Sequence, residues 1–246
     1  MNRVAWIPAF IFVFAVPLFL FTASVAWAFN DPGVYHRGFQ KYRISLATGI
    51  TEEDLRQVAG QIRHYFNSTD EPLLVKASVF GEEREIFNQR EIQHMRDVKR
   101  LVWWVYAAAA GSGIYLLAAT SWGVAVKGRD FLGVLAQRVI RGVALMGILV
   151  AVVGVFALTG FDSLFLKFHQ VAFANDLWQL DPRSDYLLII FPQGFWFDAT
   201  MGVAGLTVAG AGALTLVSGG YLLWQRQLVR GSAQESAVSL KEFPEV

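Results

Sequence analysis

Four long apolar runs constrain the fold of this chain more than any other feature. They extend over about Val4 to Ala28, Leu101 to Val126, Val139 to Phe161 and Ala199 to Trp224. Each is close to the ~20 apolar residues that a helix needs to cross a hydrocarbon core of ~30 Å. The last three contain no Asp, Glu or Lys, and Arg141 lies only at the start of the third. The pattern predicts an all-α membrane protein with four transmembrane helices.

The composition excludes several classes of protein. Of the 246 residues 54% are hydrophobic and only 17% are charged, which is a low charged fraction for a soluble globular protein. The chain has no cysteine, so disulfides, iron–sulfur clusters, thiolate zinc sites and cysteine nucleophiles are excluded. The net charge of +1 gives no reason to expect nucleic acid as a partner.

The first apolar run has a second interpretation, as a secretory signal. A short basic start ends at Arg3, and Ala26-Trp27-Ala28 resembles a signal-peptidase site. However, the run is longer than the ~7–15 residues of a typical signal core. We therefore expect an uncleaved first transmembrane helix, and a mature protein beginning at Phe29 would contradict this.

The basic residues that flank the runs predict the orientation in the membrane. With four crossings, one side collects Arg3, Lys127, Arg129, Arg138, Arg141, Arg226 and Arg230. Positive charge favours the cytoplasm, so both termini are predicted to be cytoplasmic. Three cations on the other side, Arg96, Lys99 and Arg100, oppose this assignment. They end a long translocated region, in which the charge rule is weak.

This orientation divides the chain into six parts. They are a first transmembrane helix (1–29), an extracytoplasmic region (30–98), the second and third helices with their cytoplasmic loop (99–161), an extracytoplasmic site loop (162–198), the fourth helix (199–225) and a cytoplasmic tail (226–246).

The extracytoplasmic region 30–98 is predicted to be small and α(+β). Thr51 begins a capped helix whose apolar positions recur with helical spacing: Leu55, Val58, Ala59, Ile62 and Phe66. The segment 30–35 has the composition of a turn. Residues 73–75 and 78–80 are weak candidates for two short strands. From about Asn88 a helix leads directly into the second transmembrane run.

The loop 162–198 gathers polar and aromatic residues between two transmembrane helices. His169, with Phe165 and Phe173 four residues to either side, fits a short interfacial helix. Ionisable groups at a membrane surface often mark a functional site. The alternative is an ordinary polar loop with an aromatic belt. The apolar segment 187–192 is too short to cross a bilayer, so we interpret it as re-entrant and buried in protein.

His94 is the expected partner of His169. It lies three residues before Asp97, on one face of the helix that leads into the second run. Each histidine lies at the outer end of a transmembrane helix. Small residues on the second and fourth helices favour a compact bundle. We therefore predict one outward-facing pocket that contains both imidazoles. The alternative is a surface histidine in an ordinary ion pair with Asp97.

The order of these features resembles the bacterial integral-membrane family of the lipoprotein intramolecular transacylase (Lit). The most specific parts are His94-Met95-Arg96-Asp97-Val98-Lys99 and the stretch 168–192, which contains Phe168-His169, Asn175-Asp176 and Asp181-Pro182. The resemblance extends from the first run to the fourth. It implies transfer of the sn-2 acyl chain of a diacylglyceryl-cysteine lipoprotein to its own α-amino group, giving a lyso-form lipoprotein. The implied partners are that lipoprotein and membrane lipid.

Histidine chemistry suits such a reaction. An imidazole titrates near neutral pH, so it can take a proton from the amine and return one to the leaving alkoxide. We assign this role to His169, with His94 as a second acid/base or a stabiliser of the oxyanion. The remaining site candidates are Asp97, Asp181 and Asp185 as groups that orient an imidazole, and Phe168, Phe173, Asn175 and Trp178 as substrate-binding residues. No metal or cofactor is required, because nucleophile and acyl donor belong to one molecule.

Two other classes of function stay open. A non-enzymatic membrane protein would use the outer segments 30–98 and 162–198 to bind a partner. A metal-dependent membrane hydrolase would use His94, His169 and an aspartate as ligands. The second is the weaker, because no two histidines have the four-residue separation of zinc-protease helices.

Overall fold

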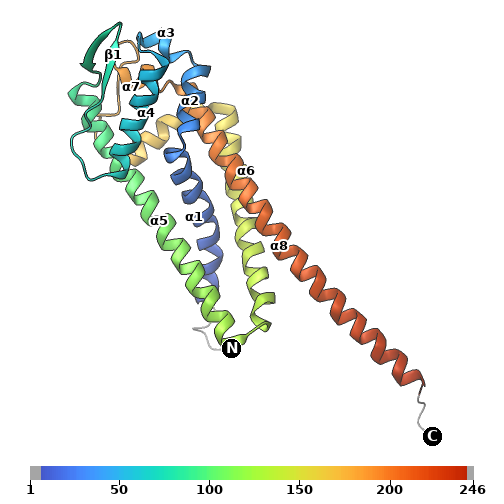
Figure 1. Cartoon of the computed structure of the whole chain (residues 1–246). Helices are drawn as coiled ribbons and strands as arrows, with labels where there is room; N and C mark the ends of the chain where they lie inside the picture. Colours follow the sequence, from blue (N-terminus) through green and yellow to red (C-terminus); the bar gives the residue numbers. More distant parts are fainter. Residues whose placement is uncertain (1–6, 243–246) are drawn as a thin grey trace. The chain divides into compact units, whose positions relative to one another are not determined.

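Four long helices dominate the computed structural model, which describes residues 7–242 (Figure 1). They are α1 (Ile7–Asn30), α5 (Gln89–Lys127), α6 (Asp130–Ala172) and α8 (Gln193–Glu242). Each is long and apolar enough to cross a membrane. The last three contain a predicted run whole, and α1 contains the part of the first run that lies within the described residues. The prediction of an all-α membrane protein with four transmembrane helices is therefore confirmed. Arg3, which contributed to the orientation, lies outside the described residues.

The chain forms two compact units. The first comprises Met1–Leu20, Gly111–Leu149 and Val208–Val246, and thus holds one part of each long helix. Glycines allow close packing on α1: a Cβ added to Gly142 would lie 2.6 Å from Val16, and one added to Gly210 would lie 3.1 Å from Leu20. Small residues at helix contacts are the usual way in which membrane helices approach each other.

The spacing of Gly205, Ala209 and Ala213 places small residues along one face of the fourth helix, but a different small residue makes the contact. Ala209 and Ala213, two members of the expected small-residue face of the fourth helix, are exposed. Their neighbour Gly210 faces α1 instead. The sequence pattern identified small residues as important for packing but did not identify the face that packs.

The second unit comprises Phe21–Ala110 and Val150–Thr207. Besides parts of the long helices it contains α2 (Pro32–Lys41), α3 (Ile44–Thr48), α4 (Glu52–Asn67), β1 (Lys76–Val79), β2 (Glu82–Glu85) and α7 (Tyr186–Ile190). The helix predicted after Thr51 is confirmed as α4. The Thr51 hydroxyl accepts a hydrogen bond of 3.1 Å from the Asp54 amide, and the whole predicted apolar face is buried.

The segment 30–35, interpreted as a turn, instead leads into helix α2. The Asp31 carboxylate accepts a hydrogen bond of 3.0 Å from the Gly33 amide, and Pro32 occupies the first helical turn. An aspartate cap followed by proline is a common helix start, because proline lacks the amide hydrogen that would be unpaired there. Asp31-Pro32 is therefore a helix start, and the prediction of a turn is wrong here.

The strand pair lies later in the chain than predicted. β1 and β2 pair antiparallel, and the turn between them places Phe80 and Gly81 at φ 51° and φ 90°. All four residues of β2 are exposed, so this strand has no apolar–polar alternation to detect. Residues 73–75 are not a strand, although Leu73 and Val75 are buried.

The apolar segment 187–192 packs against residues 30–98. Leu187 and Ile190 of α7 are buried in one cluster with side chains of α2 and α4. Next to α7, Phe191 lies with its ring centroid 5.7 Å from that of Phe39 on α2. The expected burial of this segment in protein is thus provided by the fold of residues 30–98.

Two helices differ from the expected boundaries. Helix α6 continues through the third apolar run to Ala172, with non-helical backbone angles at Gly160 (φ −170°, ψ 59°). The expected interfacial helix around His169 is the part of α6 beyond this interruption. Helix α8 extends through most of the predicted tail, to Glu242.

Candidate active site

The two predicted histidines lie side by side. His94 belongs to the first turns of α5, and His169 to the part of α6 beyond Gly160. Their ring centroids are 6.1 Å apart. His94 is 7% exposed, whereas His169 is half-buried. Residues 75 positions apart are therefore brought into one site by the second unit alone.

Hydrogen bonding distinguishes the two imidazoles. Nδ1 of His169 lies 2.8 Å from the carbonyl oxygen of Phe165, one helical turn earlier. Because a carbonyl only accepts, Nδ1 is assigned as the protonated nitrogen, which leaves the lone pair of a neutral ring on Nε2. Nδ1 of His94 is buried and has no hydrogen-bond partner among the described residues. Buried polar atoms are usually satisfied, so this nitrogen is an exception among the described residues.

Aromatic rings enclose His169. The ring centroids nearest to its own belong to Phe165 (4.4 Å), Phe168 (5.2 Å), Trp178 (5.4 Å) and Phe173 (5.6 Å). Phe173 also lies 5.1 Å from His94, so it contacts both imidazoles. The three predicted aromatic residues are thus all at the site. Phe165, which we had regarded only as part of the aromatic face of this helix, also belongs to the site through its carbonyl and its ring.

Asp97 does not hydrogen-bond to His94. Its carboxylate accepts a hydrogen bond of 2.8 Å from the side-chain amide of Asn175 and lies 3.3 Å from the guanidinium of Arg100. The ordinary ion pair between His94 and Asp97 is therefore not formed. Instead, the Asp97–Asn175 bond ties the segment after α6 to α5 beside the two imidazoles.

Asp181 and Asp185 shape the loop between α6 and α7. The guanidinium of Arg183 contacts the Asp181 carboxylate at 3.0 and 3.1 Å and holds the pKa of this exposed carboxyl below its ordinary value. The Asp185 carboxylate accepts hydrogen bonds from Asn88 (2.9 Å) and from the Asp181 amide (2.7 Å). Among the described residues, no carboxylate hydrogen-bonds to either histidine, and no three His, Asp or Glu side chains are placed to hold a metal ion together.

Sequence reasoning missed Glu91, one turn before His94. Its fully buried carboxylate accepts one hydrogen bond of 2.7 Å from the Asn88 amide and another of 2.7 Å from the Leu187 amide. In return, Oδ1 of Asn88 accepts from the Glu91 amide at 3.1 Å. This reciprocal pair is a capping box, and the three-residue spacing of Asn88 and Glu91 was a readable signal for it. Glu91 therefore fixes the start of α5 and joins it to α7.

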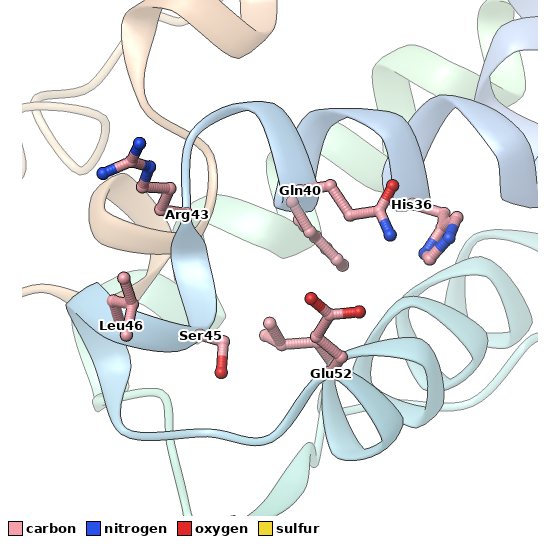
Figure 2. A pocket seen from close by; sticks show the side chains of 8 residues that line it. His36, Gln40, Arg43, Ser45, Leu46 and Glu52 are labelled. Atoms are coloured by element: carbon pink, nitrogen blue, oxygen red, sulfur yellow. The ribbon is translucent and has the colours of Figure 1, made fainter.

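A separate pocket of about 200 Å³ lies between α2, α3 and α4. Figure 2 shows the Glu52 carboxylate pointing from the start of α4 toward α2, which contributes His36 and Gln40. None of its lining residues belongs to the histidine site. It is therefore not the pocket that the sequence predicted.

Comparison with known proteins connects this geometry to one family. The sequence model of the family "Lipoprotein intramolecular transacylase Lit" matches residues 10–196, which is more than half of the chain. An uncharacterized protein of Aquifex aeolicus (strain VF5) is 29% identical over 136 residues, a match that covers 55% of this chain and 57% of that protein. The chain thus spans little more than half the length of this relative.

Solved structures agree in fold. The crystal structure of the membrane-integral lipoprotein intramolecular transacylase Lit from Bacillus cereus matches with a TM-score of 0.75 and 15% identity, over 93% of this chain and 100% of that one. A variant of the same protein with one histidine replaced by alanine matches with a TM-score of 0.72 and 15% identity, over 92% and 97% of the two chains. At this identity the similarity establishes the membrane fold.

Proposed function

The chain belongs to the family of the lipoprotein intramolecular transacylase Lit, and we propose that it catalyses an acyl shift within one lipoprotein molecule. The sn-2 acyl chain of the diacylglyceryl-cysteine moves to the α-amino group of that cysteine. The product is a lyso-form lipoprotein. The observation that carries the proposal is the pair of imidazoles with centroids 6.1 Å apart inside an aromatic enclosure.

The reaction exchanges an ester for an amide without a co-reactant. The neutral α-amine attacks the ester carbonyl, a C–N bond forms, and the nitrogen loses a proton. The C–O bond to sn-2 of the glycerol then breaks, and the alkoxide gains a proton. Each step therefore needs a group that exchanges protons near neutral pH, and imidazole is suited to both.

The hydrogen bonds of the site suggest which imidazole begins the reaction. Because Nδ1 of His169 donates to Phe165, its Nε2 is the unprotonated nitrogen and serves as the general base. His94 contributes a second nitrogen on the far side of the reacting carbonyl, as the acid for the alkoxide or the donor to the oxyanion. Two imidazoles this close can hydrogen-bond to different heteroatoms of one tetrahedral intermediate, the amine nitrogen and an ester oxygen, at the required ~2.6–3.2 Å.

The aromatic walls support aminolysis over hydrolysis. Phe173 contacts both imidazoles and is 8% exposed, so it limits the access of water to the reacting ester. The competing nucleophile, the α-amine, belongs to the substrate itself. Well-oriented intramolecular nucleophiles reach effective molarities of about 10⁵–10⁸ M, which exceeds any concentration of water.

The proposed orientation places this site outside the cytoplasm. The basic residues Lys127, Arg129 and Arg138 flank the ends of α5 and α6 opposite to the histidines. By the positive-inside rule that side is cytoplasmic, so residues 30–98 and 162–198 are extracytoplasmic. Diacylglyceryl lipoproteins, with their acyl chains in the bilayer, would enter from the outer leaflet.

Expression in a bacterium that makes only diacyl lipoproteins tests the function. An acyl shift leaves the mass of the N-terminal lipopeptide unchanged, so tandem mass spectrometry must locate the acyl chain. We expect fragments with an N-acyl group and a monoacylglyceryl thioether. Lipopeptides that keep a free α-amine and a diacylglyceryl group, with the protein present in the membrane, would contradict the proposal.

A further inference from the structure

Residues 96–104 of α5 carry a basic and aromatic face. Arg96, Lys99, Arg100, Trp103 and Trp104 recur at spacings of three and four residues, so their side chains share one side of the helix. At 3.6 residues per turn, this side lies roughly opposite to His94. Its three cations, Arg96, Lys99 and Arg100, are the ones whose position opposed the predicted orientation. A ligand for these cations would explain the positive charge at this end of the helix.

A groove lies along this face. It has a volume of about 460 Å³ and is lined by Thr69, Glu71, Lys99, Arg100, Trp103 and Trp104. Trp104 is 74% exposed, and Trp103 is 44% exposed although its indole nitrogen donates to the Phe66 carbonyl at 2.9 Å. Two exposed tryptophans where an apolar helix run begins are typical of the membrane–water interface.

Only two of the three cations are available to a ligand. The Lys99 ammonium is buried, donates to the Asp70 carbonyl at 2.6 Å and lies 3.9 Å above the Tyr65 ring. It holds the loop that forms the wall of the groove. In contrast, the Arg100 side chain is 65% exposed and has one contact, to Asp97 at 3.3 Å. Arg96 is exposed and has no hydrogen bond or ion pair with the residues that the structure describes.

We propose that this groove binds the phosphate of a membrane phospholipid. Arg100 lines the groove, and Arg96, which is not among its lining residues, lies one helical turn earlier on the same side of α5. Both arginines offer planar donor groups that match phosphate oxygens. Trp103 and Trp104 flank the glycerol and the upper acyl chains. A phospholipid would use both the arginines and the tryptophans of this face. Its anionic headgroup and its acyl chains meet at the membrane depth where tryptophans are enriched.

The groove is distinct from the histidine site but is joined to it by the 3.3 Å contact of Arg100 with Asp97. Diacylglyceryl-cysteine has a thioether where a phospholipid has its phosphate, so the groove distinguishes bulk lipid from the lipoprotein substrate. A phospholipid held here would anchor the start of α5 and the neighbouring loop 69–71 at the membrane surface.

Native mass spectrometry of the full-length, delipidated protein tests the proposal. The probes are phosphatidylglycerol and diacylglycerol with identical acyl chains, which differ in the phosphoglycerol headgroup. The wild-type protein should bind one phosphatidylglycerol in preference to diacylglycerol. R96Q/R100Q should bind phosphatidylglycerol about tenfold more weakly, because charge-assisted contacts to phosphate are lost.

A matched variant controls for net charge. R37Q/R56Q removes two exposed arginines that pair with Asp31 and Glu53 elsewhere in the outer region, and should bind phosphatidylglycerol like the wild type. Arg96→Gln alone, which breaks no contact of the fold, should give a partial loss if the double variant is unstable. Equal weakening in both double variants, or equal binding of the two lipids by the wild type, would overturn the phosphate site.

Discussion

The side-chain amide of Asn175 donates a hydrogen bond of 2.8 Å to Asp97, three residues after His94 on α5. This bond joins the segment that follows His169 to the helix that carries the other imidazole. We therefore propose that Asn175 and Asp97 position the two imidazoles and take no part in an acid–base relay.

We expect Asn175→Ala to lower kcat for acyl transfer about tenfold, because a partly exposed hydrogen bond to a charged group contributes on the order of 1–2 kcal/mol. The matched control is Gln179→Ala, which removes the 3.0 Å bond from Gln179 to Asp176 in the same segment. A positioning role predicts that Asn175→Asp also loses activity, because two carboxylates then face each other. Unchanged kcat in Asn175→Ala, with normal membrane insertion, would contradict the role.

Glu91 should determine stability rather than chemistry. Glu91→Ala leaves the buried Leu187 amide unpaired, at a cost of about 1–3 kcal/mol, and also removes the partner of the partly buried Asn88 amide. We expect a clearly lower thermal midpoint in detergent, with a smaller loss in Glu91→Gln, whose amide oxygen can still accept. Glu82→Ala on the exposed strand β2 is the control and should unfold like the wild type. Equal midpoints for Glu91→Ala and the control would show that the cap contributes little.

The ion pair of Asp181 and Arg183 should make the stability of the folded state depend on pH only at acidic pH. Arg183 lowers the pKa of Asp181, so the carboxylate stabilises the folded state above the ordinary pKa of about 3.9. This contribution is lost as pH falls through the lowered pKa. Arg183→Gln should raise the pKa of Asp181, as seen by NMR of the carboxyl carbon, and leave acyl transfer at neutral pH unchanged. A large loss of neutral-pH activity would mean that the pair acts at the site.

The proposed topology predicts the side of each loop. Reporter fusions after Gly128 and after Ser232 should both show cytoplasmic activity, whereas a fusion within residues 80–82 should show extracytoplasmic activity. An extracytoplasmic signal at Gly128 would reverse the orientation and place His94 and His169 at the inner leaflet, where the proposed substrate is absent.

The sequence predicted what depends on composition and local spacing. The four apolar runs and the capped helix α4 followed from such patterns. The proximity of His94 and His169 was predicted from their places at the ends of two transmembrane helices, and their ring centroids lie 6.1 Å apart. Contacts between distant segments were not predictable in the same way. Asp97 was expected beside an imidazole because of helical spacing. Instead, its carboxylate accepts a hydrogen bond from Asn175, which lies 78 residues later. The bond from Glu91 to Leu187 joins segments 96 residues apart and has no local sequence pattern.

The most direct test of the account measures acyl transfer by the purified protein with single histidines replaced. Losing a general acid/base typically costs about 10²–10⁴ in rate. We predict losses of this size for His94→Ala and His169→Ala on a diacylglyceryl lipopeptide, read by tandem mass spectrometry as N-acyl product. His64→Ala, an exposed histidine paired with Asp70, should retain wild-type activity. Wild-type rates in a well-folded His169→Ala protein would contradict the central claim that this pair of imidazoles carries the reaction.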